Sequence, residues 1–297
     1  MSNDSSPPKL PPPKLDDRQV RLVYDMLAVR ALADVAQALH GARVACLPVK
    51  GVVLARWLYE DVRDRPYVDV DLLVSRAAFG RAAAVVQAKD WRVFYRADEM
   101  GELSFMIGPV AVELHAEVGR IDLSRLTVDD VAARARRERE TFPFEILHVD
   151  DVDHFLLLVL NVVKDGFTYA NPHQPADLER MLARITPRLD EALDRARDAA
   201  LLTALHTTAE WMADTHGSAA FATLRARLPA AGRPLFRAAV DLQRRLSRRH
   251  TERFAGPAGM LGLALASLTP DDPTLRRHGL TRVLRRGLRR KLGQDPG

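Results

Sequence analysis

The sequence predicts an α+β fold in which a segment containing strands precedes an all-helical segment. Short runs of alternating apolar residues recur between residues 43 and 114, which is the two-residue period of a β-strand. Helical patterns lie between these runs. From residue 174 to residue 268 the pattern is helical throughout, with breaks at proline and glycine, and no strand pattern occurs. We therefore expect strands with flanking helices, followed by a helical bundle.

These patterns divide the chain into four segments. They are a disordered proline-rich tail (1–16), an α/β domain (17–150), a helical domain (151–270) and a basic C-terminal helix or tail (271–297).

Length and composition are those of a globular protein. The 297 residues, 47% of them hydrophobic, suffice for one large or two modest domains. The apolar run from Phe155 to Val163 is too short to span a bilayer, so no transmembrane segment is expected. Cys46 is the single cysteine, which excludes an internal disulfide and fits a reducing compartment. With no secretory signal pattern at the N-terminus, we expect a cytoplasmic protein.

The first elements are a long helix and a short strand. Residues 17–40 carry apolar side chains at helical spacing, with Asp16 or Asp17 as a cap and Gly41 as a terminator. A short β-like run follows from Arg43 to Leu47.

The next feature is the sequence Pro48-Val49-Lys50-Gly51, which predicts a tight turn between that strand and a helix. Gly51 would let the backbone approach a ligand, and free N–H groups at the helix start favour phosphate. Lys50 would add a point charge there. The alternative is an ordinary strand-to-helix turn.

Two aspartates define the most informative stretch, which runs from Arg65 to Val74 and predicts a strand. Because successive side chains point to opposite faces, Asp69 and Asp71 share one face. Two adjacent carboxylates repel unless a cation lies between them, and Mg²⁺ prefers such oxygens. The alternative is an exposed strand with two solvated acids.

A third carboxylate occurs further along. After a helix at 76–88, strands are expected at 91–95, 103–107 and 110–114. In the last of these, Ala111, Glu113 and His115 face one way. A glutamate in a central strand is costly to bury unless it is paired or bound to metal, so we place Glu113 beside Asp69 and Asp71. The alternative is an exposed glutamate on an edge strand.

The rest of the chain is expected to be largely helical. A charged helix is predicted from Val128 through residue 140, and residues 141–149 form either a strand or a linker. Asp150 or Asp151 caps an apolar helix over 155–163.

The C-terminal stretch 275–292 is rich in arginine and has no acidic residue. Such a helix suits a nucleic-acid backbone or an anionic membrane surface. The alternative is a basic helix that packs on the bundle with its arginines in water.

Together, Lys50-Gly51, Arg65-Pro66-x-x-Asp69-x-Asp71-Leu-Leu-Val and Glu113-Leu-His115 resemble the motifs of one family. It is the bacterial uncharacterised nucleotidyltransferase-like family, within the DNA polymerase β-type nucleotidyltransferase superfamily. The resemblance covers about residues 30–180 and includes Ala176-Asp177-Leu178. The superfamily's Gly-Ser turn is replaced here by Lys50-Gly51.

The resemblance implies a mixed sheet with flanking helices and a nucleoside triphosphate as substrate. It implies that Asp69, Asp71 and Glu113 hold two Mg²⁺ ions, with Glu113 also a candidate base. Lys50 and Gly51 would bind the triphosphate, and Arg65 would neutralise charge on the leaving pyrophosphate.

Three hypotheses follow. The first is transfer of a nucleoside monophosphate from a nucleoside triphosphate to a hydroxyl group of RNA, a sugar or another small molecule. The second, motivated by the absent Gly-Ser turn, is a catalytically inactive protein of the same fold that binds a nucleotide or a partner. The third is association with an anionic lipid surface through the basic C-terminal helix.

Overall fold

The computed structural model describes residues 15–119, 123–165, 167, 172–229 and 267–291, with side chains up to residue 284. Predictions for residues 1–14 and for the stretch 230–266 lie outside the described residues.

The described elements alternate in the first half of the chain and are helical in the second. The strands are β1 (Cys46–Val49), β2 (Asp69–Val74), β3 (Arg92–Ala97), β4 (Glu102–Ile107), β5 (Val110–His115), β6 (Arg136–Glu138) and β7 (Ile146–His148). The helices are α1 (Asp17–Gly41), α2 (Gly51–Trp57), α3 (Phe79–Ala88), α4 (Val128–Arg134), α5 (Asp151–Lys164), α6 (Gln174–Ile185), α7 (Leu189–Asp198), α8 (Leu202–His216), α9 (Ala219–Arg227) and α12 (Pro273–Lys291).

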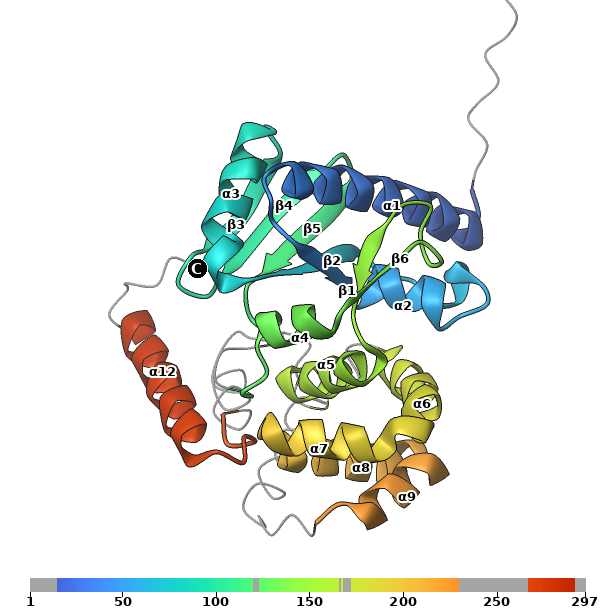
Figure 1. Cartoon of the computed structure of the whole chain (residues 1–297), viewed down its shortest axis with the longest axis vertical. Helices are drawn as coiled ribbons and strands as arrows, with labels where there is room; N and C mark the ends of the chain where they lie inside the picture. The colour runs from blue at the N-terminus through green and yellow to red at the C-terminus, as the bar shows by residue number, and fades with distance from the viewer. Residues whose placement is uncertain (1–14, 120–122, 166, 168–171, 230–266, 292–297) are drawn as a thin grey trace, which may run out of the picture.

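A five-stranded sheet in the order β1-β2-β5-β4-β3 forms the centre of the first half of the chain (Figure 1). Strands β2 and β5 are parallel, and the other neighbours are antiparallel. The sheet is therefore mixed, which confirms the predicted α+β class. Strand β5 lies in the middle, so Glu113 is on a central strand and not on an edge.

One face of the sheet is covered by α1 and α3 (Figure 1). Alternate residues of β2 and β5, such as Leu72 and Val112, are fully buried in the core on this side. Helix α1 begins as expected, with Asp16 and Gln19 forming a reciprocal capping box. The two-residue period that buries these apolar side chains turns the acidic residues of β2 and β5 toward the other face.

The other face of the sheet looks toward the helical half of the chain. Leu47, Val49 and Leu73, at the β1–β2 side, join one apolar core with helices α5, α6 and α8. This core attaches the helices to one side of the sheet and leaves the polar middle of the face beside α5.

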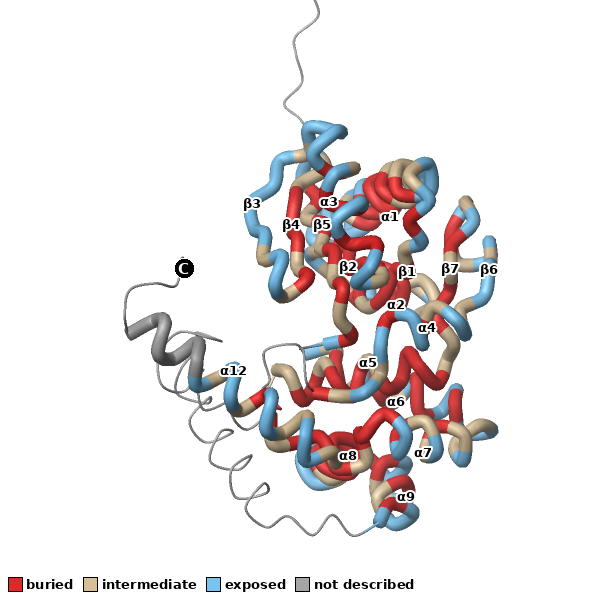
Figure 2. The backbone as a smooth tube through the Cα atoms, turned by 60° about the vertical axis from the view of Figure 1, so that its left-hand side comes forward, coloured by how far each residue is buried: buried red, intermediate tan, exposed pale blue. Residues whose placement is uncertain are grey.

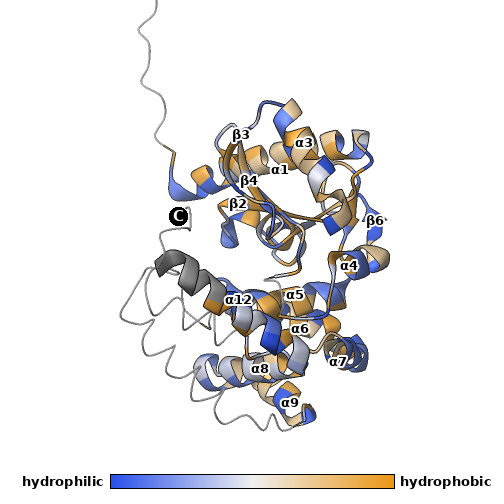
Figure 3. Ribbon diagram, turned by 90° about the vertical axis from the view of Figure 1, so that its left-hand side faces the viewer, coloured by the Kyte–Doolittle hydropathy of each residue, from blue (hydrophilic) through white to orange (hydrophobic). Residues whose placement is uncertain are grey.

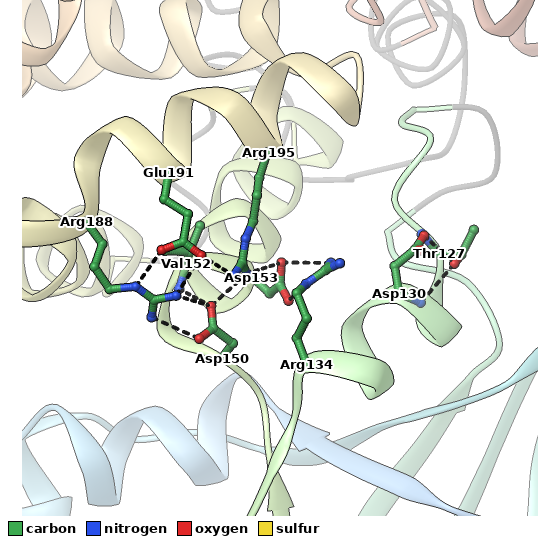
Figure 4. A network of polar contacts seen from close by, with 9 residues as sticks. All are labelled: Thr127, Asp130, Arg134, Asp150, Val152, Asp153, Arg188, Glu191 and Arg195. Carbon is green, nitrogen blue, oxygen red and sulfur yellow. Dashed lines mark hydrogen bonds and ion pairs between the residues drawn. The ribbon is translucent and has the colours of Figure 1, made fainter.

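An ion-pair network fixes the start of α5 (Figure 4). Asp153 is fully buried and contacts Arg134 of α4 at 2.7 Å and Arg195 of α7 at 3.0 Å. Arg195 also contacts Asp150, the N-cap of α5, at 2.7 Å. Helix α7 is mainly hydrophilic (Figure 3), so it is held by these charges as well as by its few buried alanines.

Two sequence predictions are wrong in detail. The charged run after Arg134 does not continue the helix, because residues 136–138 form strand β6 and pair with β7. Because β7 lies within residues 141–149, the same pairing shows that this stretch contains a strand and is not only a linker. Strand β1 begins at Cys46 instead of Arg43, because Arg43 has a positive φ of 57° in the turn that closes α1.

The helical predictions for 174–227 are confirmed, and the basic stretch near the C-terminus is helical from Pro273 to Lys291. The predicted segment boundaries at residues 150 and 270 stay predictions. None of the described helices combines the length and the apolar composition needed to cross a membrane.

Candidate active site

The register of the sheet places two carboxylates side by side. Asp71 of β2 and Glu113 of β5 are direct partners in the parallel pair, so their side chains leave the same face at the same level. Asp71 is almost completely buried, whereas the Glu113 side chain keeps 33% of its surface exposed. The pair therefore has one shielded and one accessible carboxylate.

His115 completes a compact cluster with these acids. Its Nε2 atom lies 3.0 Å from Oδ1 of Asp71 and 3.3 Å from Oε2 of Glu113. Within the described part of the chain, these three residues form a group whose donor atoms all lie within 4.8 Å of one another. The alternation of β5 predicts that His115 lies on this face, but the sequence indicates no role for it.

Lys50 reaches the same cluster from the end of β1. Val49 is the register partner of Asp71, and the next residue points its Nζ atom to within 2.6 Å of Oδ1 of Asp71. Lys50 has a positive φ of 55°, which is uncommon for a residue other than glycine. Such backbone outliers persist where the surroundings hold them, often at ligand sites.

The charges in the cluster are complementary. Burial opposes ionisation of Asp71, but Lys50 and His115 outweigh it and hold its pKa well below the usual range. Burial also opposes the charged forms of Lys50 and His115, yet contact with the carboxylates raises both pKa values. Contact with His115 lowers the pKa of Glu113. In this structure Lys50 Nζ and His115 Nε2 both contact the same carboxylate oxygen, Oδ1 of Asp71.

Asp69 lies outside this compact cluster. It precedes Asp71 by two residues on the same face, about 7 Å along the strand, and its register partner is Ala111. Burial, followed by repulsion from Asp71 and Glu113, raises its pKa to about 6. The charges of Asp71 and Glu113 therefore affect the pKa of Asp69, although Asp69 is not part of the compact cluster. The role of Asp69 as a metal ligand stays a prediction.

Arg65 makes an interaction that the sequence did not suggest. Its Nη2 atom lies 2.8 Å from Oδ2 of Asp177 in α6, and its side chain is only 7% exposed. The Tyr59 hydroxyl donates to the other carboxylate oxygen at 2.8 Å. In this structure Arg65 ties the segment before β2 to the helical half of the chain. Contact with a leaving pyrophosphate stays a prediction.

Gly51 is required by close packing. A Cβ atom at this position would lie 2.6 Å from Cβ of Tyr67 and 3.0 Å from a guanidinium nitrogen of Arg65. Packing alone therefore explains why residue 51 is glycine. The close approach of a nucleotide to Gly51 stays a prediction.

A pocket of about 560 Å³ lies between this face of the sheet and α5. It reaches from Lys50 past Glu113 and His115 to strands β4 and β3. Asn161 and Lys164, near the end of α5, line it from the helical side. The full lining is Val49, Lys50, Leu73, Phe94, Tyr95, Glu102, Ser104, Glu113, His115, Glu117, Gly119, Leu157, Asn161, Lys164 and Asp165.

The mixed five-stranded sheet with flanking helices is consistent with a nucleotidyltransferase fold. The sequence profile of a family described as uncharacterised nucleotidyltransferase matches residues 2–216, and the chain belongs to this family. A comparison with curated proteins finds no match.

Proposed function

We propose that this protein is a metal-dependent nucleotidyltransferase that moves a nucleoside monophosphate from a nucleoside triphosphate to a hydroxyl group. The observation that carries the proposal is the Asp71–Glu113 pair on adjacent central strands, with His115 and Lys50 in contact with it. The family and the pocket beside this pair agree with it.

The side chains present fit a divalent cation. Asp71 and Glu113 supply carboxylate oxygens, which Mg²⁺ and Mn²⁺ prefer, and His115 supplies an imidazole nitrogen. Asp69 would serve a second ion, and Mg²⁺ is the expected metal. The bound metal would neutralise phosphate charge and lower the pKa of the acceptor hydroxyl.

The residues of the chain would then divide the work. Lys50 would exchange its contact with Asp71 for the phosphate oxygens, since an ammonium group at the end of a flexible side chain can move between two anions. Glu113, which faces the pocket, would accept the proton of the acceptor hydroxyl. The fixed charges would stabilise the transition state mainly by position.

The test is label transfer from α-labelled nucleoside triphosphates with Mg²⁺. Acceptors are supplied in two separate arms, a low-molecular-weight cell extract and total RNA. We expect Asp71→Asn and Glu113→Gln to lower transfer about 100-fold or more. Asp98→Asn, an exposed carboxylate with 60% of its side chain accessible, is the matched control and should not change it.

Equal transfer by the wild type and Asp71→Asn would refute the assignment. Nucleotide binding with no transfer and no pyrophosphate release would instead support the inactive nucleotide-binding protein.

Association of the basic helix α12 with an anionic surface is a separate proposal. It is supported by the exposed Arg277 and Arg282, and comparing liposome flotation with and without residues 275–297 tests it.

A further inference from the structure

One row of residues crosses the whole sheet through the candidate site. Val49, Asp71, Glu113, Ser104 and Tyr95 are successive register partners on β1, β2, β5, β4 and β3. With about 4.8 Å between neighbouring strands, Tyr95 is about 14 Å from Asp71 along this row. Lys50 adjoins one end of the row, and the pocket follows the row to the other end.

The chemistry of the proposed transfer places the leaving group and the acceptor at opposite ends of this row. The acceptor oxygen attacks the α-phosphorus, the bond from that phosphorus to the β-phosphate oxygen breaks, and pyrophosphate leaves with the electron pair. The hydroxyl proton passes to Glu113. Attacking and leaving oxygens lie roughly in line. If pyrophosphate leaves on the Lys50 side, the acceptor enters from the Ser104–Tyr95 side; this step rests on the proposed function.

A β-bulge shapes that side of the pocket. Val93 pairs with Phe105, but the next register pair is Tyr95 with Ser104, so Phe94 is an extra residue. As a result two consecutive aromatic residues, Phe94 and Tyr95, line the pocket, and they are 54% and 41% exposed. They belong to β3, an edge strand of the sheet, which is exposed along most of its length (Figure 2). Two flat aromatic rings thus line this end of the pocket.

The charge of the lining limits what that ligand can be. The pocket is lined by four carboxylates and three basic side chains: Glu102, Glu113, Glu117 and Asp165 against Lys50, Lys164 and His115. Glu102 lies beside the aromatic pair and accepts a hydrogen bond from the Tyr95 hydroxyl at 3.3 Å. Proteins that bind nucleic-acid backbones present cations to the phosphates, which is the opposite arrangement.

We propose that Phe94, Tyr95, Glu102 and Ser104 form the acceptor subsite for a small polyhydroxylated ring, of the sugar or cyclitol class, that carries no negative charge. The carbon face of the ring packs on Phe94 and Tyr95, and its hydroxyl groups meet Ser104 and Glu102. The pocket volume is within the range of about 300–1,000 Å³ that is usual for small-molecule sites. RNA, the other acceptor considered from the sequence, does not fit this lining.

The experiment is saturation-transfer NMR on the full chain with four probes at millimolar concentration: D-glucose, D-glucosamine, D-glucose 6-phosphate and an RNA trinucleotide with a free 3′-hydroxyl. We expect ring-proton signals for glucose and glucosamine only. Phe94→Ala should weaken both about fivefold or more, whereas Phe94→Trp should retain them. Val93→Ala is the matched control, because this neighbour on the same strand does not line the pocket.

Three results would overturn the proposal: neither sugar binds, Phe94→Ala leaves the sugar signals unchanged, or the phosphorylated sugar or RNA gives a signal that depends on Phe94. Binding of ATP with Mg²⁺ is measured in parallel. Bound ATP without bound sugar removes only the acceptor assignment. Bound sugar without bound ATP removes the proposed nucleotidyl transfer.

Discussion

The ion pair between Arg65 and Asp177 offers a sharp test of how the two halves of the chain are joined. Both side chains are almost fully buried, at 7% and 1% exposure, and the shortest N–O distance is 2.8 Å. Unit charges about 3 Å apart attract by about 5 kcal/mol at an effective dielectric constant of about 20. Desolvation offsets much of this attraction, so the intact pair contributes far less than that to stability.

Removal of one partner is a different perturbation, because it leaves a buried charge without compensation. We expect Arg65→Gln or Asp177→Asn to lower the free energy of unfolding by about 3–5 kcal/mol each. The double variant should cost less than the sum of the two, with a coupling energy of about 2 kcal/mol or more. Equilibrium unfolding in urea measures all three values.

The matched control is the exposed pair Arg197–Asp194, whose side chains are 60% and 70% accessible. Asp194→Asn should change stability little, because surface ion pairs contribute little. A cost under about 1 kcal/mol for each single variant, or two effects that simply add, would show that Arg65 and Asp177 are not a coupled buried pair.

Three further predictions concern single side chains. Gly51→Ala should lower the free energy of unfolding by about 1–3 kcal/mol, because the added Cβ overpacks the site. Gly41→Ala should not destabilise the protein, because a Cβ at that position meets nothing within 4 Å. Equal melting temperatures for the two variants would contradict this prediction. Burial, followed by the neighbouring His148 ring, lowers the pKa of His154 to about 3, so the unfolded chain binds a proton below pH 6.5 that the folded chain refuses. Stability should therefore fall by about 2 kcal/mol from this group between pH 7 and pH 5, and urea unfolding of His154→Phe should lack that part of the pH dependence; an unchanged pH dependence would contradict it. Lys50→Ala should weaken nucleotide binding in calorimetric titrations and leave divalent-cation binding equal or stronger, because the Lys50 ammonium contacts the Asp71 carboxylate in this structure. Weaker cation binding by the variant would contradict the idea that Lys50 and the cation compete for Asp71.

Strands β2 and β5, which carry the site, are predictable from the sequence. Alternation of apolar and acidic residues in β2 and β5 predicts which side chains share a face, and the structure confirms that Asp71 and Glu113 meet. His115 obeyed the same alternation, so its place on the face was predictable. Its contact with Asp71, 44 residues away, depends on the parallel register and was not.

Contacts between distant segments account for what the sequence missed. Arg65 and Asp177 are 112 residues apart, and each looks like an ordinary charged residue in isolation. The charged run 136–138 has no apolar alternation, yet it forms a strand because β7 supplies a partner. The bulge that brings both Phe94 and Tyr95 to the pocket is likewise a property of pairing with β4.

We propose above all that Asp71, Glu113 and His115 bind a divalent cation beneath a nucleoside triphosphate. Mn²⁺ is a direct probe, because electron paramagnetic resonance reports the free ion during a titration. We predict Mn²⁺ binding to the wild-type protein that strengthens when ATP is present and is lost in Glu113→Gln, while Asp98→Asn retains it. Mn²⁺ binding of equal strength in the wild type and Glu113→Gln, with or without ATP, would contradict the account.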